Sequence, residues 1–325
     1  MKVKLIFLFF CISLNISSKE KIYKFAIIAK NSEQKFYKEV QKGCERRAAE
    51  LKNVECIFPK TKSANHLVQE RILMELYNSD IDGIAMAVIN SDYTEKSLEK
   101  YLRKDVPLIT FDADFSKKVL TKNQTIRKAY IGTNNYQLGK TLAELFYKDK
   151  PIPKEYCVLS GNRIADNLNQ RVKGFVETLT KLDKKKYYIH NERCPVYSYE
   201  KSDKSLSFFR KILRLQTEDK LVPSVIIMGT IAQEDEAKFR AMITESGKKK
   251  SELNIYSIDT IQNQLNLLKD GYLKGLVGQK PEEMGSRSID LLFSIKKGVK
   301  VKELNYTDLN ICTRSNYLTC TKSSK

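Results

Sequence analysis

Short apolar runs and longer amphipathic stretches take turns along almost the whole chain. The run at residues 25–29 is followed by apolar residues at helical spacing from Phe36 to Leu51, and the same order then recurs. Such alternation indicates βαβ units, which build parallel sheets with helices on both faces. The further runs that we predict to be strands lie at 54–58, 83–88, 108–111, 129–131, 157–160, 187–190, 225–228, 255–258, 275–278 and 309–312.

The first eighteen residues have the layout of an export signal. Two lysines precede an apolar run from Leu5 to Ile12, and a short semi-polar segment ends at Ser18. The apolar run is shorter than the ~20 residues that a membrane-spanning helix needs. We therefore predict a signal peptide over residues 1–18 and a soluble, periplasmic mature protein.

The rest of the chain is long enough for two lobes, since roughly 305 residues remain and domains average about 150 residues. The alternation of predicted strands and helices builds one unit and then a second. We therefore predict two successive doubly wound α/β units.

The formal net charge is +19, but the lysines are scattered along the chain. No basic helix with interleaved aromatic residues stands out in the sequence. A clustered basic surface is the usual mark of nucleic acid binding, so we expect no nucleic acid partner.

The sequence lacks the usual motifs of catalysis. No Gly-x-Gly-x-x-Gly, Walker loop or Gly-x-Ser-x-Gly follows a predicted strand. The two histidines, His66 and His190, stand in no recognisable arrangement with a nucleophile, and no Cys-x-x-Cys pair suggests zinc. Asp112 and Asp114 could pair as acid and base, but we expect both to take part in ligand binding instead. We expect no enzyme activity, no cofactor and no metal.

An even number of cysteines follows the predicted signal, which permits disulfides in an exported chain. We predict a Cys312–Cys320 bond, because a turn between them can fold the tail back as a hairpin. A Cys157–Cys194 bond is disfavoured, because the parallel strands 157–160 and 187–190 would hold these two residues far apart. The first two cysteines suit either a bond or a core position. The six residues are Cys44, Cys56, Cys157, Cys194, Cys312 and Cys320.

Polar residues gather at the carboxyl ends of the predicted strands. Ligands of open α/β sheets bind beyond this edge, so these residues predict one cleft. Carboxylates and amides exchange hydrogen bonds with hydroxyl groups, and aromatic faces cover apolar C–H surfaces. The pattern is typical of a site for a polyhydroxylated ligand. The candidate side chains are Lys30, Phe36, Tyr37, Asp112, Asp114, Asn169, Thr230, Asp259 and Gln279.

Six segments, in this order, resemble the type I periplasmic binding proteins of the ribose-binding kind. The resemblance covers nearly the whole mature chain, from about Lys24 to Arg314. The segments are 34–37 (Gln-Lys-Phe-Tyr), 107–114 (Pro-Leu-Ile-Thr-Phe-Asp-Ala-Asp), 130–139 (Tyr-Ile-Gly-Thr-Asn-Asn-Tyr-Gln-Leu-Gly), 167–175 (Asn-Leu-Asn-Gln-Arg-Val-Lys-Gly-Phe), 257–259 (Ser-Ile-Asp) and 277–281 (Val-Gly-Gln-Lys-Pro).

The resemblance implies a particular division of the chain. The fold would be α/β, with two doubly wound parallel-sheet lobes joined by a three-strand hinge. The N-terminal lobe would comprise residues 22–132 plus 280–306. The C-terminal lobe would comprise residues 133–279 plus 307–325.

The resemblance also implies roles for single residues. Phe36 and Tyr37 match aromatics that clamp a sugar ring, and Gln34 matches a polar neighbour of theirs. Asp112 and Asp259 match carboxylates that accept sugar hydroxyls, one from each lobe. Gln279 matches a polar hinge residue. Asn169 and Arg171 fall in a loop-to-helix segment of the second lobe.

Departures from the family pattern leave the identity of the ligand open. Ala113 and Asn169 stand where arginines are usual, and Thr230 stands roughly where an asparagine is usual. Lys30 occupies a small polar position at the end of the first strand. A Lys30 that reaches the cleft would favour a carboxylated or phosphorylated ligand, whereas a Lys30 that snorkels to solvent would not.

The resemblance implies a solute receptor for an ABC-type importer, which closes on a small sugar or polyol by hinge motion and docks on a membrane permease. The alternative is a signalling subunit that reports ligand occupancy to a membrane sensor kinase. A DNA-binding repressor with the same fold would need an N-terminal helix-turn-helix. The predicted first strand begins too early in this chain to leave room for one.

Overall fold

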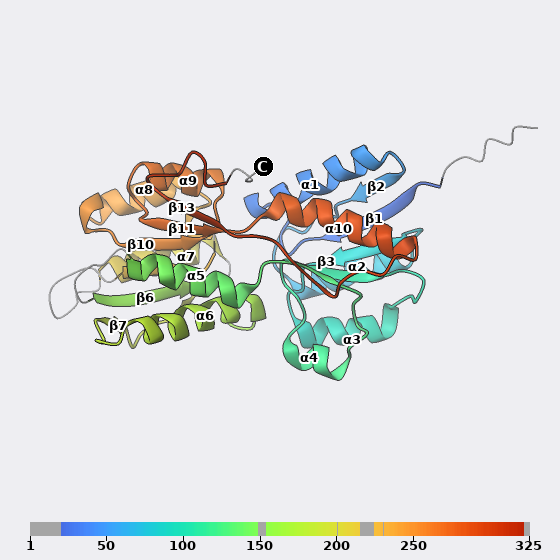
Figure 1. Cartoon of the computed structure of the whole chain (residues 1–325), viewed down its shortest axis with the longest axis horizontal. Helices are drawn as coiled ribbons and strands as arrows, with labels where there is room; N and C mark the ends of the chain where they lie inside the picture. Colours follow the sequence, from blue (N-terminus) through green and yellow to red (C-terminus); the bar gives the residue numbers. More distant parts are fainter. Residues whose placement is uncertain (1–20, 149–153, 200, 215–223, 230, 322–325) are drawn as a thin grey trace, which may run out of the picture.

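The computed structural model describes residues 21–148, 154–199, 201–214, 224–229 and 231–321. The predicted signal peptide, residues 1–18, lies outside these residues. Two α/β lobes stand side by side, each with one sheet between two layers of helices (Figure 1). This confirms the predicted fold class. Within the described ranges, no helix has both the length and the apolar character needed to cross a membrane.

The first lobe is built on a six-stranded, fully parallel sheet in the order β12-β5-β4-β3-β1-β2. Its strands are β1 (Tyr23–Ile28), β2 (Val54–Ile57), β3 (Gly83–Met86), β4 (Leu108–Phe111), β5 (Tyr130–Gly132) and β12 (Leu304–Tyr306). Its helices are α1 (Lys35–Leu51), α2 (His66–Tyr77), α3 (Ser91–Tyr101), α4 (Lys117–Lys122) and α10 (Pro281–Lys296).

The second lobe has a sheet in the order β13-β11-β10-β9-β6-β7, and β8 also pairs with β6. Among the described strands of this sheet, only β13 runs antiparallel to its neighbour. The strands are β6 (Lys154–Ser160), β7 (Tyr188–His190), β8 (Val196–Tyr197), β9 (Ser224–Ile227), β10 (Ile255–Ile258), β11 (Gly275–Gly278) and β13 (Asn310–Thr313). The helices are α5 (Asn135–Lys148), α6 (Asp166–Leu182), α7 (Ser202–Leu213), α8 (Glu236–Glu245) and α9 (Gln262–Lys269), with two short 3₁₀ turns, η1 (Ile231–Gln233) and η2 (Lys250–Glu252).

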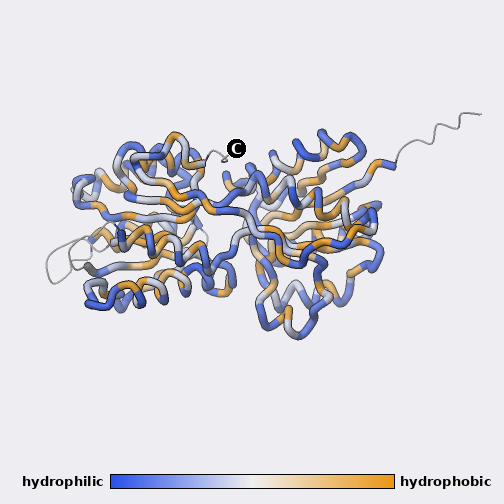
Figure 2. The backbone as a smooth tube through the Cα atoms, in the orientation of Figure 1, coloured by the Kyte–Doolittle hydropathy of each residue, from blue (hydrophilic) through white to orange (hydrophobic). Residues whose placement is uncertain are grey.

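Both faces of each sheet are buried, as the continuous apolar runs predict. In β1, Phe25 and Ile27 pack against α1 and α10, whereas Ala26 and Ile28 pack on the opposite face under α2 and α3. In the same way, α5 and α6 cover one face of the second sheet, and α7, α8 and α9 cover the other. Figure 2 shows the hydrophobic residues gathered along the strands and the hydrophilic ones on the outer surfaces.

The chain passes between the two sheets three times. It leaves the first sheet after β5, returns to it after β11, and leaves it again after β12 to form β13. These passages lie side by side where the two lobes meet (Figure 1). The residue boundaries of the lobes that we gave from the sequence stay a prediction.

Each lobe contains one very close helix crossing made by a pair of glycines. Gly43 of α1 lies against the backbone of Glu282, and Gly285 of α10 lies against Val40. In the second lobe, Gly139 of α5 lies against the backbone of Arg171 in α6, and Gly174 of α6 lies against that of Tyr136. A Cβ at any of these glycines would overlap a main-chain oxygen, so the crossings require residues without a side chain.

The described residues form three disulfides. Cys312–Cys320 is confirmed, with a Cα–Cα distance of 5.3 Å, and Cys44 bonds Cys56 across 6.0 Å. The judgement against Cys157–Cys194 is wrong, because this pair also bonds, with Cα atoms 5.4 Å apart. The sequence predicts one strand beside β6, whereas β7 and β8 lie along it one after the other. Cys194 falls in the gap between them, opposite Cys157.

Replacing Cys157 and Cys194 together by alanine is expected to lower the free energy of unfolding by roughly 4 kcal/mol, because the bond closes a loop of 37 residues in the unfolded chain. The same change at Cys312 and Cys320, which are 8 residues apart, should remove only about 2.5 kcal/mol. Denaturant titration followed by circular dichroism measures both losses. Equal losses would contradict this order.

Candidate ligand-binding site

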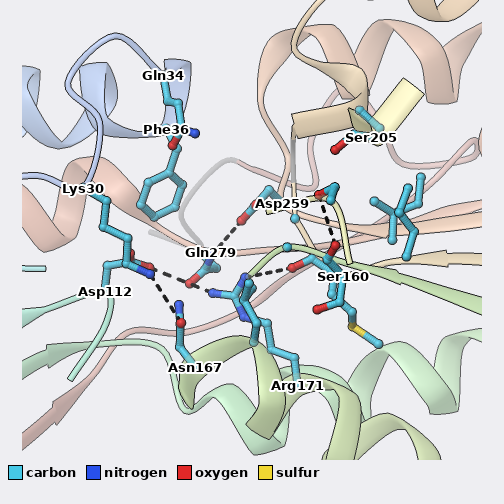
Figure 3. Close-up of a pocket in the computed structure, with 18 of the residues that line it drawn as sticks. Lys30, Gln34, Phe36, Asp112, Ser160, Asn167, Arg171, Ser205, Asp259 and Gln279 are labelled. Carbon is cyan, nitrogen blue, oxygen red and sulfur yellow. Dashed lines mark hydrogen bonds and ion pairs between the residues drawn. The ribbon is translucent and has the colours of Figure 1, made fainter. Parts of the chain in front are cut away.

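A cavity that is partly open to solvent lies between the two lobes. Its polar walls come mainly from the carboxyl ends of β1, β4, β6, β9, β10 and β11, together with α6 (Figure 3). The structure therefore brings strand ends from both sheets to one place. The sequence-predicted residues that line the cavity are Lys30, Gln34, Phe36, Tyr37, Asp112, Arg171, Asp259 and Gln279.

Two aspartates occupy equivalent positions in the two lobes. Asp112 follows β4 with φ 56°, and Asp259 follows β10 with φ 77°. Aspartate is among the few residues that tolerate this left-handed conformation. Both are nearly fully buried and line the cavity.

Neighbouring polar groups hold both carboxylates in place. The hydroxyl of Tyr37 donates to Oδ2 of Asp112 across 2.7 Å. The amide of Gln279 donates to Oδ1 of Asp259, also across 2.7 Å, while its own Oε1 is buried without a hydrogen-bond partner. Each carboxylate thus keeps acceptor capacity for a ligand, and Gln279 offers a free acceptor beside them.

Arg171 projects from α6 and is held on three sides. Its Nε donates to Oδ1 of Asn135 at 2.7 Å, and its Nη1 donates to the carbonyl oxygen of Met228 at 3.2 Å. Its Nη2 lies 3.9 Å from Oδ1 of Asp112 in the other lobe. The guanidinium is therefore fixed at the interface, with its charge facing a carboxylate across the cavity.

Lys30 does not snorkel to solvent. It is 5% exposed, and its Nζ donates to Oδ1 of Asn167 in the other lobe at 3.4 Å. Within the part of the chain that the structure describes, no carboxylate lies within ion-pair distance of Lys30. A buried ammonium has three donors, so this group has donors left for a ligand.

Phe36 provides the apolar wall. Its ring faces the space bounded by Lys30, Asp112 and Gln279 (Figure 3). Tyr37 packs edge-on against Phe36, with ring centroids 5.2 Å apart, and against Phe111 behind it. Tyr37 therefore supports both the aromatic wall and, through its hydroxyl, the position of Asp112.

Asp114 does not line the cavity. Arg127, which is buried, donates from Nη2 to Oδ2 of Asp114 at 2.7 Å, and Thr110 donates to Oδ1 at 2.6 Å. The carboxylate serves this internal ion pair instead of the cleft. The strand ends before Asp114, so its spacing of two residues from Asp112 does not predict the direction of the Asp114 side chain.

Asn169 also lies away from the cavity. It is exposed, and its amide donates to the carbonyl oxygen of Arg163 at 2.9 Å. Asn167, two residues earlier in α6, lines the cavity in its place. Two residues turn a helix by about 200°, so the two amides face opposite sides. Thr230, another residue that the sequence predicted for the site, lies outside the described residues.

Three serines in the cavity wall were not found from the sequence: Ser160, Ser198 and Ser205. Ser160 ends β6, so the strand-end rule could have included it. Ser198 follows β8, a two-residue strand that carries no recognisable pattern, and Ser205 lies inside α7. Neither of these two has a signal in the sequence that marks it as part of a site.

A larger groove leads to the cavity. Phe36, Asp259 and Gln279 line both hollows, so they stand at the boundary between them. The groove is otherwise walled by the first turns of α1 and by residues around the starts of α9 and α10. It gives a route from solvent to the polar residues of the cavity.

Burial raises the pKa of Asp259. Arg171 and Gln279 act in the opposite direction, and the charge of Asp112 adds to the rise. The folded protein therefore binds a proton at Asp259 more readily than the unfolded chain does. The stabilisation that this protonation provides is complete below the carboxyl's unfolded pKa of about 3.9 and is lost as the pH rises through the folded-state value.

We expect the Asp259→Asn variant to have a higher free energy of unfolding than the parent at pH 7 and a nearly equal one at pH 4, in the absence of ligand. Asparagine tolerates the left-handed backbone and stays uncharged when buried. Urea titrations at the two pH values test this. A variant that is less stable at pH 7 would show that the buried carboxylate is better compensated than its surroundings indicate.

Comparison with known proteins gives a consistent result. Residues 25–300 match a family described as a periplasmic binding protein domain. The curated D-apiose import binding protein of Actinobacillus succinogenes is 25% identical over 154 residues, which is 47% of each chain. The match thus spans about half the length of that relative.

Solved structures cover the chain more fully. An ABC transporter solute-binding protein from Burkholderia graminis, in complex with D-arabinose, is 24% identical, with a TM-score of 0.78 over 95% of this chain and 100% of that one. Another from Agrobacterium vitis, with bound D-fucose, is 20% identical, with a TM-score of 0.80 over 91% and 97% of the two chains. At this identity the likeness shows the fold.

Proposed function

Because this chain belongs to the periplasmic binding protein family, we propose that it captures a small, uncharged sugar between its lobes and delivers it to an ABC-type importer. The family is one of exported, periplasmic proteins, and we propose that residues 1–18 direct the export. The importer role is preferred to signalling through a sensor kinase, because the curated relative is an import binding protein.

The observation that carries the proposal is the balance of charge in the cavity. The described lining residues include two cations, Lys30 and Arg171, and two carboxyl groups, Asp112 and Asp259. Sugar hydroxyls both donate and accept hydrogen bonds, so a neutral polyol can bind donors and acceptors together. A carboxylated or phosphorylated ligand would face two acidic groups as well as the two cations.

Both lobes must contribute to capture. Lys30, Phe36 and Asp112 come from the first lobe, whereas Arg171 and Asp259 come from the second. A ligand that binds all of them bridges the lobes and favours the closed arrangement. We propose that a membrane permease recognises this closed form.

We also propose that the cavity binds its ligand without chemistry. The described residues of its wall include neither a histidine nor a cysteine. The two carboxyl groups are engaged by Tyr37 and Gln279, which donate to them. Groups arranged in this way hold hydroxyls in place, and none of them is positioned as a nucleophile with its own base.

A thermal-shift screen tests the proposal with neutral pentoses and hexoses against the matching uronates and sugar phosphates. A neutral sugar at 100 times its Kd should stabilise the protein by about 2.7 kcal/mol and raise the Tm. Stabilisation by the anionic sugars alone would refute the charge argument. Stabilisation by none of the sugars would refute the function.

A further inference from the structure

The cavity continues from the charged residues into the second lobe. This extension, which we call the serine arm, is lined by Ser160, Ser198, Ser205, Ile227 and Ala232. It lies between the ends of β6 and β9 and the first half of α7. In Figure 3, Ser160 and Ser205 lie beyond Arg171 and Asp259, on the side away from Lys30 and Phe36.

Two hydroxyls of the serine arm have unused hydrogen-bonding capacity. Ser160 is 2% exposed, and its Oγ is buried without a partner. Ser205 is also 2% exposed as a whole residue, and no hydrogen bond to a described residue involves its hydroxyl. Buried helical serines elsewhere in the chain bond back to the preceding turn, as Ser97 does to Tyr93 and Ser288 does to Met284.

The partners of these hydroxyls must therefore come from within the cavity. A buried hydroxyl left without a hydrogen bond costs about 1–3 kcal/mol. The neighbouring hydroxyl of Ser198 is already engaged, since it donates to the carbonyl oxygen of Ser160 at 3.1 Å. A ligand group that reaches the serine arm would satisfy Ser160 and Ser205 together.

The chemistry of the arm differs from that of the rest of the cavity. The four charged lining residues lie toward the other end, and among the described residues the arm itself presents hydroxyls and aliphatic groups. Such a lining suits a short chain of carbons that carries hydroxyl groups. It offers no countercharge to a phosphate or a carboxylate.

We propose that the serine arm binds the hydroxylated exocyclic chain of the sugar, so that the protein selects sugars that carry this chain over pentopyranoses and over 6-deoxy sugars. This inference rests on the proposed function and specifies its substrate class. Lys30, Asp112, Arg171 and Asp259 would hold the ring, and Ser160 and Ser205 would hold the chain.

Two series of sugars test the inference by isothermal titration calorimetry. L-arabinose, D-fucose and D-galactose share one ring configuration and carry hydrogen, methyl or hydroxymethyl on C5. D-xylose, 6-deoxy-D-glucose and D-glucose form the second series. In the series that the protein binds, we expect the hydroxymethyl sugar to bind at least about tenfold more tightly than the methyl sugar.

Variants of α7 locate the effect. Ser205→Ala should weaken binding of the hydroxymethyl sugar about tenfold and leave binding of the methyl sugar unchanged. Ser205→Leu fills the arm and should abolish the preference. Ser207→Ala, at an exposed position of the same helix, is the matched control. Because alanine is a good helix former, Ser205→Ala tests the proposal even if the leucine variant fails to fold.

The outcomes separate the two proposals. Equal affinities within the bound series, or an equal effect of Ser205→Ala on all its members, would overturn the role of the serine arm and leave the proposed function intact. Failure of the wild-type protein to bind any neutral sugar, those of the thermal-shift screen included, would count against the proposed function itself.

Discussion

We expect the Gly139→Ala variant to lose about 3 kcal/mol or more of its free energy of unfolding. The new methyl group would overlap the carbonyl oxygen of Arg171, and main-chain atoms of α6 cannot move aside without separating the two helices. Overpacking against a rigid neighbour costs about 1–3 kcal/mol, sometimes more. Alanine's better helix propensity returns about 1 kcal/mol, so a net loss of about 3 kcal/mol requires an overpacking cost of about 4 kcal/mol, above the common range. We expect this higher cost because the overlap is with a main-chain oxygen.

The same substitution should also weaken ligand binding. Arg171 lies at the point where α6 meets Gly139, and its guanidinium lines the cavity. Displacement of α6 would move that group relative to Asp112. Calorimetric titration with the sugar that stabilises the wild-type protein most in the screen would measure this second effect.

Thermal unfolding measures the loss of stability, which should appear as a fall in Tm of roughly 6–12 °C if one lobe of about 150 residues unfolds as a unit. Lys140→Ala, at the next position of α5, is the matched control. Its side chain is 41% exposed and makes only a loose ion pair with Glu144 at 3.8 Å, so its Tm should barely change. A Gly139→Ala variant with the wild-type Tm would mean that the helices are not in close contact.

The Asp112→Asn variant should lose roughly 10–150-fold in affinity for the sugar and still fold. A hydrogen bond to a charged group contributes about 1.5–3 kcal/mol, and asparagine keeps the shape but not the charge. Asparagine also tolerates the left-handed backbone at this position, where φ is 56°. The hydroxyl of Tyr37 can still donate to the amide oxygen. Calorimetric titration gives the affinity, and thermal unfolding shows whether the fold is kept.

Asp114→Asn is the natural counterpart, two residues away. It should keep the affinity for the sugar and lose stability, because the buried Arg127 would be left with only Glu303, at 3.3 Å. Removing one partner of a buried ion pair costs about 3–5 kcal/mol. If Asp114→Asn weakened binding as much as Asp112→Asn, the distinction between a ligand-binding and a structural aspartate would be wrong.

The fold was largely predictable from the sequence, because strands buried on both faces produce continuous apolar runs. Two strands escaped this rule. β8 has two residues, and β12 lies at the edge of its sheet with two of its three side chains exposed. Neither needs an apolar pattern. β8 also explains the missed Cys157–Cys194 bond, since it extends the line of β7 beside β6.

The candidate site was predictable where the backbone alone decides the position. Lys30, Asp112, Asp259 and Gln279 directly follow strands, and parallel strands end at one edge. The direction of a side chain after a strand depends on local backbone angles, so Asp114 could not be told from Asp112. Ser205 lies on a helix whose orientation is set by packing against the sheet.

The position of α10 in the sequence affects how the protein is made. Met284, Ile289 and Leu292 of this helix complete a core whose other members come mostly from the first 131 residues. A ribosome must therefore synthesise most of the chain before the first lobe can bury its apolar surface. Until then, β1 and β3 lack the part of their cover that α10 provides. This order delays stable folding of the first lobe until α10 has been synthesised. If residues 1–18 direct export, as we propose, the chain would therefore reach a translocation channel before this lobe has folded.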